Sequence, residues 1–552
     1  VYLSEMREWV KNRTRFSEHL SQQCDTNYKL EIAKMFSRAD KIYFPHNVDF
    51  RGRAYTVPPH LSHISSDQAR GLLMFGEGKP LGPNGLRWLK IHLSNMYGND
   101  KVSLDDRAAF TESRLNEIRQ CVADPRSAKF WQEADSPWQC LAACYELVAA
   151  IDHPTGPETF NSRLPIQQDG SCNGLQHYAA LGGDPKGAKE VNLIPSDVPQ
   201  DVYRKVANLV EERLERDSKL DSHYLSDKDR MIAGLLKGKI TRKIVKTTVM
   251  TNVYGVTQYG AREQLMTNMR DAGLLMEDNE LSMQARNYLA RLVFDSLKEL
   301  FVQAKHIQDW LAAAADEIGR ALPEESARLF GYSEDAEAPA DTESDYRRPM
   351  TIEPLAAMST KDRWLSRYPQ TAVAWTTPLN FIVVQPYNKC ETISLLTCLQ
   401  QVSIRRPTMG DPVDITKQVT AFPPNFIHSL DATHMLMTAI ECAKRGVVMA
   451  SVHDCFWTHA ATVDEMSTVL REQFVALYSQ DILKKLRDEF LVRYKNYKVP
   501  IYANVLGEEF DPDTEKTRKK TKRGWRPIRF PPLPSKGSLD LSQVLQSRYF
   551  FS

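Results

Sequence analysis

Two short apolar stretches, far apart in the chain, each reach an aspartate where a buried strand would end or turn. The first is LPIQQ, which stops at Asp169 and is followed by small residues. The second is VVMASV, which runs into His453 and Asp454 and then into CFWTH, the pattern of a strand, a tight turn and a second strand. A carboxylate at such a position can face a cleft and hold a hard cation. If both strands belong to one sheet, the two carboxylates converge on a pair of metal ions, as in two-metal phosphoryl transfer.

Each aspartate alone is a weak signal, because an aspartate at a strand end is more often a turn or capping residue. Two nearby groupings contain the residue types of other sites: His428, Ser429 and Asp431 for a hydrolase triad, and His453, Cys455 and His459 for zinc. A helix spreads the first group around its circumference, and a strand sends alternate residues of the second group to opposite faces. We therefore expect neither a hydrolase triad nor a zinc site.

A basic segment, LLKGKITRKIVKTTVMTNVYG, predicts a helix that presents cations. At about 100° per residue, Arg242 and Lys246 lie one turn apart on the same face, and Tyr254 follows two turns later. Gly255 is suited to ending that helix. This face can offer two positive charges to a triphosphate and a ring to a base or sugar, although a solvated basic helix is the simpler interpretation. A glycine-rich phosphate loop of the GxxxxGK[ST] type does not occur in the sequence.

Taken together and in order, these motifs resemble those of the family A polymerase superfamily. The sequence is most similar to the single-subunit RNA polymerases of bacteriophages and mitochondria. The mitochondrial branch is favoured by the following segments: VDFRGRAY, SSDQARGLL, GPNGLRWLKIHLSN, VNLIPSD, PPNFIHSLDATH and the terminal YFFS. The resemblance runs from about residue 25 to the C-terminus.

The resemblance implies DNA-templated synthesis of RNA from ribonucleoside triphosphates, with two Mg²⁺ ions held by Asp169 and Asp454. It makes Lys246 a catalytic residue that contacts the triphosphate and assists proton transfer to the departing pyrophosphate. It assigns the incoming nucleotide to the following residues: Arg242, Lys246, Tyr254, His428, Gly174 and Lys90. It assigns contacts with nucleic acid to Arg51 and Arg53, and to Arg405 and Arg406 in a hairpin that enters promoter DNA.

Gly174 bears on the choice of sugar. DNA polymerases of this superfamily carry a bulky glutamate five residues after the first aspartate, whereas this chain has Gly174 there, which leaves room for a ribose. His428 and Tyr254 can then form hydrogen bonds that a deoxyribose cannot return. Two alternatives stay open, a family A DNA polymerase and a catalytically inactive relative that binds nucleic acid.

The expected fold is α+β and mostly helical, a right-hand polymerase with a palm built on a small antiparallel sheet and helical fingers. We expect four parts: a helical segment at 1–42 on the thumb side, the first part of the palm at 43–197, the fingers at 198–428, and the second part of the palm at 429–552. Within the fingers we expect an acidic insertion at about 331–345 and the specificity hairpin at about 395–420, with the segment RRPTMGDP at a hairpin tip. The second part of the palm carries a basic C-terminal extension, KTRKKTKRGWRPIR.

Composition sets few further limits. The 552 residues carry 71 basic and 70 acidic side chains, so the net charge of +1 gives no global signal for polyanion binding. The nine cysteines include no CxxC pair, which favours a reducing compartment, and no apolar run is long enough to span a bilayer. We expect a monomer in the mitochondrial matrix that works with mitochondrial transcription factors on a DNA template and an RNA product. Because the chain starts at Val1, we also expect that preceding sequence has been removed.

Overall fold

The computed structural model describes residues 2–219, 226–253, 255–274, 279–330, 332, 370–396, 401–408, 411–511 and 516–552. These residues form an α+β fold that is mostly helical and contains several small antiparallel sheets, as the sequence predicted. Tyr254 and nearly all of the acidic segment at 331–345 lie outside the described residues. Among the described helices, none is long and apolar enough to cross a membrane.

A three-stranded antiparallel sheet in the order β11–β12–β5 organises the centre of the molecule. Its strands are β5 (Pro165–Asp169), β11 (Ala450–Val452) and β12 (Cys455–His459). Alternating burial along β5 follows the two-residue period of a strand with one face in the core. The sheet therefore joins segments from the middle and the end of the chain.

One hydrophobic core lies beneath the first part of the chain and beside this sheet. It includes Leu89, Leu147 and Ile166, all at most 1% exposed. The helices around it are α2 (Asp67–Leu72), α3 (Gly82–Tyr97), α4 (Leu104–Ser113), α5 (Leu115–Ala123) and α6 (Pro137–Ile151). Residues 126–136 precede α6, and Pro137 occupies the first turn of that helix, where a missing N–H costs nothing.

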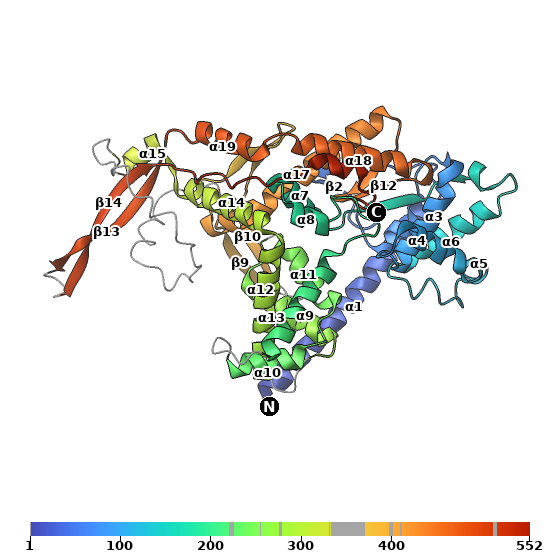
Figure 1. Cartoon of the computed structure of the whole chain (residues 1–552), viewed down its shortest axis with the longest axis horizontal. Helices are drawn as coiled ribbons and strands as arrows, with labels where there is room; N and C mark the ends of the chain where they lie inside the picture. The colour runs from blue at the N-terminus through green and yellow to red at the C-terminus, as the bar shows by residue number, and fades with distance from the viewer. Residues whose placement is uncertain are drawn as a thin grey trace.

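A second and larger core lies under the remaining helices. These are α7 (Asn173–Gly182), α8 (Pro185–Glu190), α9 (Val202–Lys219), α10 (Asp227–Leu236), α11 (Arg242–Asn252), α12 (Gln258–Asp271), α13 (Asn279–Leu300), α14 (Val302–Arg320), α17 (Ile415–Lys444), α18 (Val463–Tyr478) and α19 (Ile482–Arg493). Helices α9 to α13 project together from the body of the molecule (Figure 1). The long helix α1 (Tyr2–Phe36) runs beside them in that view. The expected boundary between fingers and palm, at residues 428 and 429, falls inside α17.

The remaining strands form two-stranded ribbons or small additions to sheets. The pairs are β1 (His46–Val48) with β2 (Ala54–Thr56), β3 (Lys79–Pro80) with β4 (Asn161–Ser162), β7 (Ala374–Thr376) with β8 (Ile382–Val384), and β9 (Glu391–Leu396) with β10 (Gln401–Arg406). A short α15 (Glu324–Leu329) follows β6 (Leu322–Pro323). Short 3₁₀ helices lie at Pro157–Thr159, Ala460–Thr462 and Leu541–Gln546.

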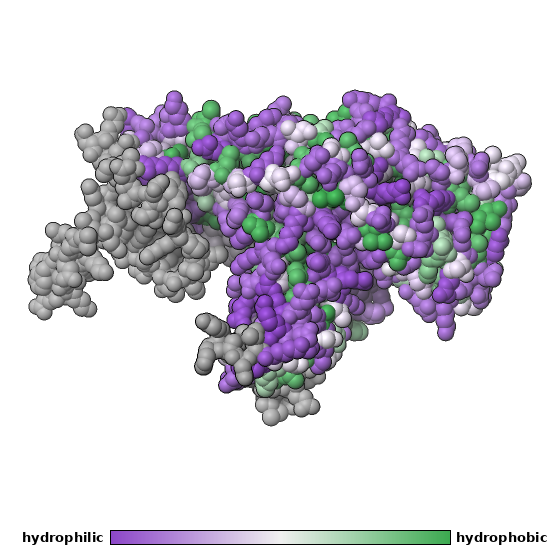
Figure 2. Space-filling view, viewed as in Figure 1, coloured by the Kyte–Doolittle hydropathy of each residue, from purple (hydrophilic) through white to green (hydrophobic). Residues whose placement is uncertain are grey.

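The basic extension continues a sheet. β13 (Tyr497–Asp511) pairs antiparallel with β14 (Lys516–Pro527), and β13 also pairs with β6. The ribbon extends away from the helices at one end of the molecule (Figure 1). At its base, Trp525 is 4% exposed and Arg526 forms an ion pair with Glu317. The face in Figure 2 is mostly hydrophilic, with apolar residues scattered over it.

Candidate active site

Asp169 and Asp454 lie side by side on the central sheet. β5 pairs with β12 in a register that places Asp169 directly opposite Cys455, the residue after Asp454. Asp454 is the second residue of the two-residue turn between β11 and β12. The first residue of this turn, His453, has a left-handed φ of +57°, which is uncommon for a residue with a side chain. The sheet thus brings together two carboxylates from distant parts of the chain.

The pKa values of these two carboxyl groups reflect burial and the charges around them. Burial, and then the charge of Asp454, raise the pKa of Asp169 to about 7. Burial also raises the pKa of Asp454, while its own backbone N–H and the charge of Arg53 oppose that rise. Asp169 nevertheless keeps contact with solvent. A carboxyl group whose ionisation is disfavoured by burial and by a neighbouring carboxylate is stabilised in its ionised form when a cation binds beside it.

The donor set fits Mg²⁺ better than a softer metal. Within the described part of the chain, no group of three or more histidine, cysteine, aspartate and glutamate side chains is arranged to hold a metal ion. Mg²⁺ needs no such cage, because it is commonly held by one or two carboxylates, with water and phosphate oxygens completing the shell. Asp169 and Asp454 match that requirement.

The last residues of the chain support the loop that follows Asp169. The backbone N–H of Ser552 donates to the carbonyl oxygen of Asp169 at 3.1 Å, and Gly170 forms a β-bridge with Phe551. The buried side-chain amide of Gln176 donates to the carbonyl of Phe550 at 3.0 Å. The terminal aromatic residues carried part of the family resemblance, but their role in supporting this loop was not predicted from the sequence. Their signal was a cluster of large aromatic residues at an end of the chain.

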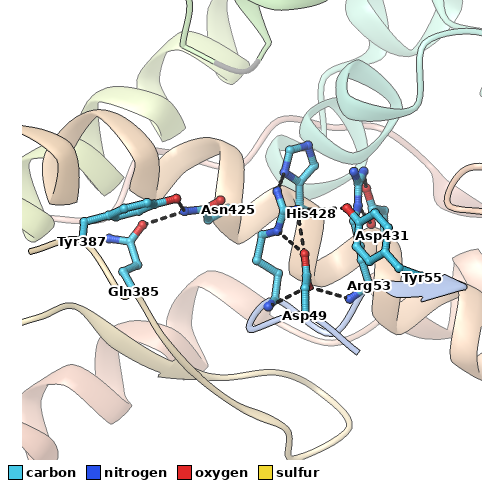
Figure 3. A network of polar contacts seen from close by, with 9 residues as sticks. Asp49, Arg53, Tyr55, Gln385, Tyr387, Asn425, His428 and Asp431 are labelled. Atoms are coloured by element: carbon cyan, nitrogen blue, oxygen red, sulfur yellow. Dashed lines mark hydrogen bonds and ion pairs between the residues drawn. The ribbon is translucent and has the colours of Figure 1, made fainter. Parts of the chain in front are cut away.

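The turn between β1 and β2 joins two arginines to helix α17, and Figure 3 shows Arg53 of this turn beside Asp431. One carboxylate oxygen of Asp49 accepts hydrogen bonds from the backbone N–H groups of Arg51 (2.9 Å) and Arg53 (3.0 Å). The other accepts from the Arg51 guanidinium at 2.9 and 2.7 Å. Arg51 Nη1 lies 2.8 Å from Nδ1 of His428, and Arg53 forms an ion pair with the buried Asp431. Both arginines therefore hold protein groups on α17.

Gly52 allows this turn to approach the helix. Its φ of +97° lies in the left-handed region, and a Cβ built there would be 3.6 Å from Cβ of Ala432 on α17. A side chain at this position would be strained by the backbone conformation. The glycine between the two arginines thus permits their joint contact with α17.

Burial shifts the pKa values of His428 and Asp431, both on α17, in opposite directions. It lowers the pKa of His428 to about 2, helped by the charges of Arg53 and Arg51, so the imidazole is neutral. It raises the pKa of Asp431 to about 6, because the loss of hydration outweighs the attraction of Arg53. His428 is thus an uncharged hydrogen-bonding group.

A second set of hydrogen bonds fixes the segment after β8 to α17 (Figure 3). Asn425 donates to Gln385 Oε1 and to the Tyr387 hydroxyl, both at 2.9 Å. Gln385 donates to Gln418 Oε1 at 2.8 Å. These amides are buried, so their mutual hydrogen bonds replace water. The part of α17 that precedes His428 is therefore anchored from two sides.

The basic helix lies close to the loop after Asp169. Arg242 is the first residue of α11, where its guanidinium pairs with Asp201 at 2.6 Å and lies 5.2 Å from the ring centre of Tyr203. Tyr203 in turn hydrogen bonds the thiol of Cys172, three residues after Asp169. Lys246 lies one turn further along α11 and is exposed. Both cations therefore lie on one helix, as the sequence predicted.

The end of α11 agrees with the glycine signal. The helix stops at Asn252, and Gly255 has a φ of +75° with its N–H bonded to the carbonyl of Asn252 at 3.1 Å. A left-handed glycine is a common way to end a helix. Tyr254 itself lies outside the described residues.

The other candidate residues occupy different places. Gly174 is buried in the first turn of α7, directly after the Asp169 loop. Lys90 lies on α3 and forms an ion pair with Glu112 of α4 at 2.6 Å. Arg405 and Arg406 lie on β10 opposite Thr392 and Glu391. The interpretation of RRPTMGDP as a hairpin tip is therefore wrong: the paired strands run from 391 to 406, and Pro407 follows the last residue of β10.

Comparison with known proteins places the chain in a family. The family profile described as DNA-dependent RNA polymerase matches residues 79–552. The mitochondrial DNA-directed RNA polymerase of Schizosaccharomyces pombe is 45% identical over 96% of this chain and 42% of its own length. That of Neurospora crassa is 45% identical over 89% and 34%, and DNA-directed RNA polymerase 1B, mitochondrial, of Nicotiana tabacum is 41% identical over 100% and 47%.

The chain belongs to the DNA-dependent RNA polymerase family. It spans less than half the length of the three curated relatives named above.

Proposed function

We propose that this chain carries the catalytic centre of a DNA-directed RNA polymerase. The observation that carries the proposal is the pairing of β5 with β12, which sets Asp169 beside Asp454 in a member of this family. Asp169 and Asp454 would hold Mg²⁺, and two such ions would activate the attacking 3′-hydroxyl and neutralise the triphosphate.

The side chains around the two carboxylates have distinct tasks. Lys246 is exposed on α11 and is available to the triphosphate, where it offsets charge on the departing pyrophosphate and can supply a proton to it. Arg242 adds a second charge, although its pairing with Asp201 makes it the less mobile of the two cations. Tyr254 would pack on the incoming nucleotide, and Lys90 would have to leave Glu112 to reach it.

Two residues at the proposed sugar site support RNA as the product. Gly174 has no side chain to block a 2′-hydroxyl, and the neutral imidazole of His428 can share a hydrogen bond with it. Arg51 and Arg53 would contact the nucleic acid only through groups not engaged by Asp49, His428 and Asp431. Arg405 and Arg406 would contact promoter DNA from β10. A DNA polymerase is the alternative, and equal use of deoxynucleotides and ribonucleotides would favour it.

The partners and location follow from the relatives. Relatives whose names specify mitochondrial polymerases suggest that this chain transcribes the mitochondrial genome in the matrix, with a DNA template, an RNA product and mitochondrial transcription factors. We further propose that it acts as a monomer. The proposed parts remain a thumb-side helix at 1–42, palm at 43–197 and 429–552, and fingers at 198–428.

Templated extension of an RNA primer with ribonucleotides and Mg²⁺ tests the proposal. Wild-type protein should extend the primer in the order set by the DNA template. Asp169→Asn and Asp454→Asn should each lose activity by at least about a hundredfold, since each removes charge from the cation site. Asp152→Asn, at an exposed aspartate paired with Arg119, is the matched control and should retain activity. Full activity in Asp454→Asn would contradict the assigned role.

A further inference from the structure

The hydrogen bond between Arg51 and His428 determines where the histidine carries its proton. Arg51 Nη1 lies 2.8 Å from His428 Nδ1. A guanidinium group has only donors, so Nδ1 must be the acceptor in this contact. An imidazole whose Nδ1 accepts, and which is neutral, carries its one N–H on Nε2. The geometry thus selects one of the two neutral tautomers.

The donor is held firmly in place. The Arg51 guanidinium also donates to Asp49 at 2.9 and 2.7 Å and to the Tyr55 hydroxyl at 3.2 Å. Its side chain is only 18% exposed and that of Asp49 only 20%. The guanidinium carbon also lies 5.5 Å from the ring centre of Phe50. Rotation of Arg51 away from His428 would break several of these contacts at once.

The imidazole has little tendency to take up a second proton. Burial, and then the charges of Arg53 and Arg51, lower the pKa of His428 to about 2. A protonated ring would also lose the Arg51 hydrogen bond, because Nδ1 would become a donor facing a donor. The neutral Nε2–H form is therefore the one the surroundings support.

We propose that Arg51 is a positioning residue for sugar selection: it fixes His428 as the Nε2–H tautomer, which presents a hydrogen-bond donor to the 2′-oxygen of a ribonucleotide. This inference rests on the proposed function, and it assigns Arg51 a task besides contact with nucleic acid. The donor is set before substrate arrives, so no free energy is spent on selecting the tautomer during binding. Asp49 acts on His428 only indirectly, because its carboxylate orients the Arg51 guanidinium.

Nitrogen NMR of histidine-labelled protein reads the tautomer directly and needs no substrate. His428→Gln identifies the His428 signals by their loss. The expected pattern is a protonated Nε2 and an unprotonated Nδ1. A protonated Nδ1 would overturn the inference.

Kinetics then test the consequence for sugar selection. Arg51→Gln offers an amide that can either donate or accept, so it no longer imposes one tautomer. The ratio of kcat/KM for ribonucleotides to that for deoxynucleotides should fall about three- to tenfold, the value of one hydrogen bond. Arg51→Lys keeps a donor with no acceptor and should retain more of the preference. Arg119→Gln, at an exposed arginine paired with Asp152, should leave the ratio unchanged.

The possible failures are distinguishable. If Arg51→Gln slows both sugars equally, Arg51 is only structural and the inference is wrong. If Arg51→Lys loses the preference as fully as Arg51→Gln, the donor property is not what matters, and the inference is also wrong. If wild-type protein makes no templated RNA, the proposed function fails, while the NMR measurement still decides the tautomer.

Discussion

The buried ion pair between Arg53 and Asp431 should cost the protein stability while serving its active site. Asp431 is 4% exposed and Arg53 12%, and Arg53 Nε donates to Asp431 Oδ1 at 3.1 Å. Even with this partner, burial raises the pKa of Asp431 from 3.8 to about 6. At 1.36 kcal/mol per pH unit, ionised Asp431 disfavours folding by about 3 kcal/mol above pH 6.

Removing both charges should therefore stabilise the fold. Arg53→Met/Asp431→Leu replaces the pair with apolar groups of similar size and should raise the free energy of unfolding at pH 8 by about 1–4 kcal/mol. Arg53→Met alone strands a buried carboxylate and should lower it by about 3–5 kcal/mol. The double variant should lose polymerase activity, because the charge of Arg53 favours ionised Asp454.

Urea unfolding followed by tryptophan fluorescence measures these changes. Trp375 is a local probe, since it packs on Phe422 and donates to Ser429 on α17. The folded state binds the Asp431 proton more tightly than the unfolded state, so this group alone lowers stability as pH rises from about 4 to 6, against the opposite contribution of the buried His92 and His434. The double variant should therefore gain stability with pH more steeply than wild type over this range.

The exposed pair of Arg119 and Asp152 provides a matched control. Arg119→Met/Asp152→Leu removes a similar two-bond contact at side chains 45% and 51% exposed, and should leave stability nearly unchanged because water already screens this pair. The reasoning would be refuted if the buried double variant were less stable than wild type, or if it retained full polymerase activity.

Three further predictions concern other parts of the molecule. Burial lowers the pKa values of His92 and His434 to about 4. Each histidine should therefore lower the free energy of unfolding as pH drops from about 6.5 to 4, by up to about 1.4 kcal/mol per pH unit. Urea midpoints measured across this range should show the decrease, and His92→Gln should make the midpoint depend less steeply on pH. Gly255→Ala should destabilise the end of α11 more than Gly238→Ala, because both glycines have φ of +75° but only at Gly255 would a Cβ lie 3.3 Å from the Thr420 carbonyl oxygen; equal losses in thermal unfolding would disprove that contact. On β14, Lys522 and Arg523 stand opposite Ala503 and Tyr502, and Lys520 lies at a register shift, whereas Lys516, Arg518 and Lys519 stand opposite acidic residues. The triple variant Lys520→Gln/Lys522→Gln/Arg523→Gln should therefore reduce the salt dependence of DNA binding more than Lys516→Gln/Arg518→Gln/Lys519→Gln does. Identical salt dependence in the two triple variants would count against a DNA contact by this ribbon.

The sequence predicted the parts of the fold whose signals are local. The strand ending at Asp169 and the turn at Asp454 carry apolar periodicity next to polar residues, and the structure has both. Gly255 likewise ends its helix as expected. The proline and glycine after Arg406 were misinterpreted, because these residues mark the end of a strand as readily as a turn.

The partners across the site could not be predicted, because they depend on tertiary contacts. Nothing local in the sequence shows that Asp431 pairs with Arg53 or that Arg51 reaches His428. The same holds for the bond from Ser552 to Asp169. Resemblance pointed to residues that lie near the sheet, while the interactions that orient them became visible only in the folded chain.

Electron paramagnetic resonance of Mn²⁺ binding to the metal-free protein tests the central claim most directly. If Asp169 and Asp454 form one cation site, Asp169→Asn and Asp454→Asn should each abolish the same tight Mn²⁺ binding, and the double variant should add no further loss. Asp152→Asn should bind Mn²⁺ as wild type does. Tight binding that persists in either single variant would contradict the claim that the two carboxylates act together.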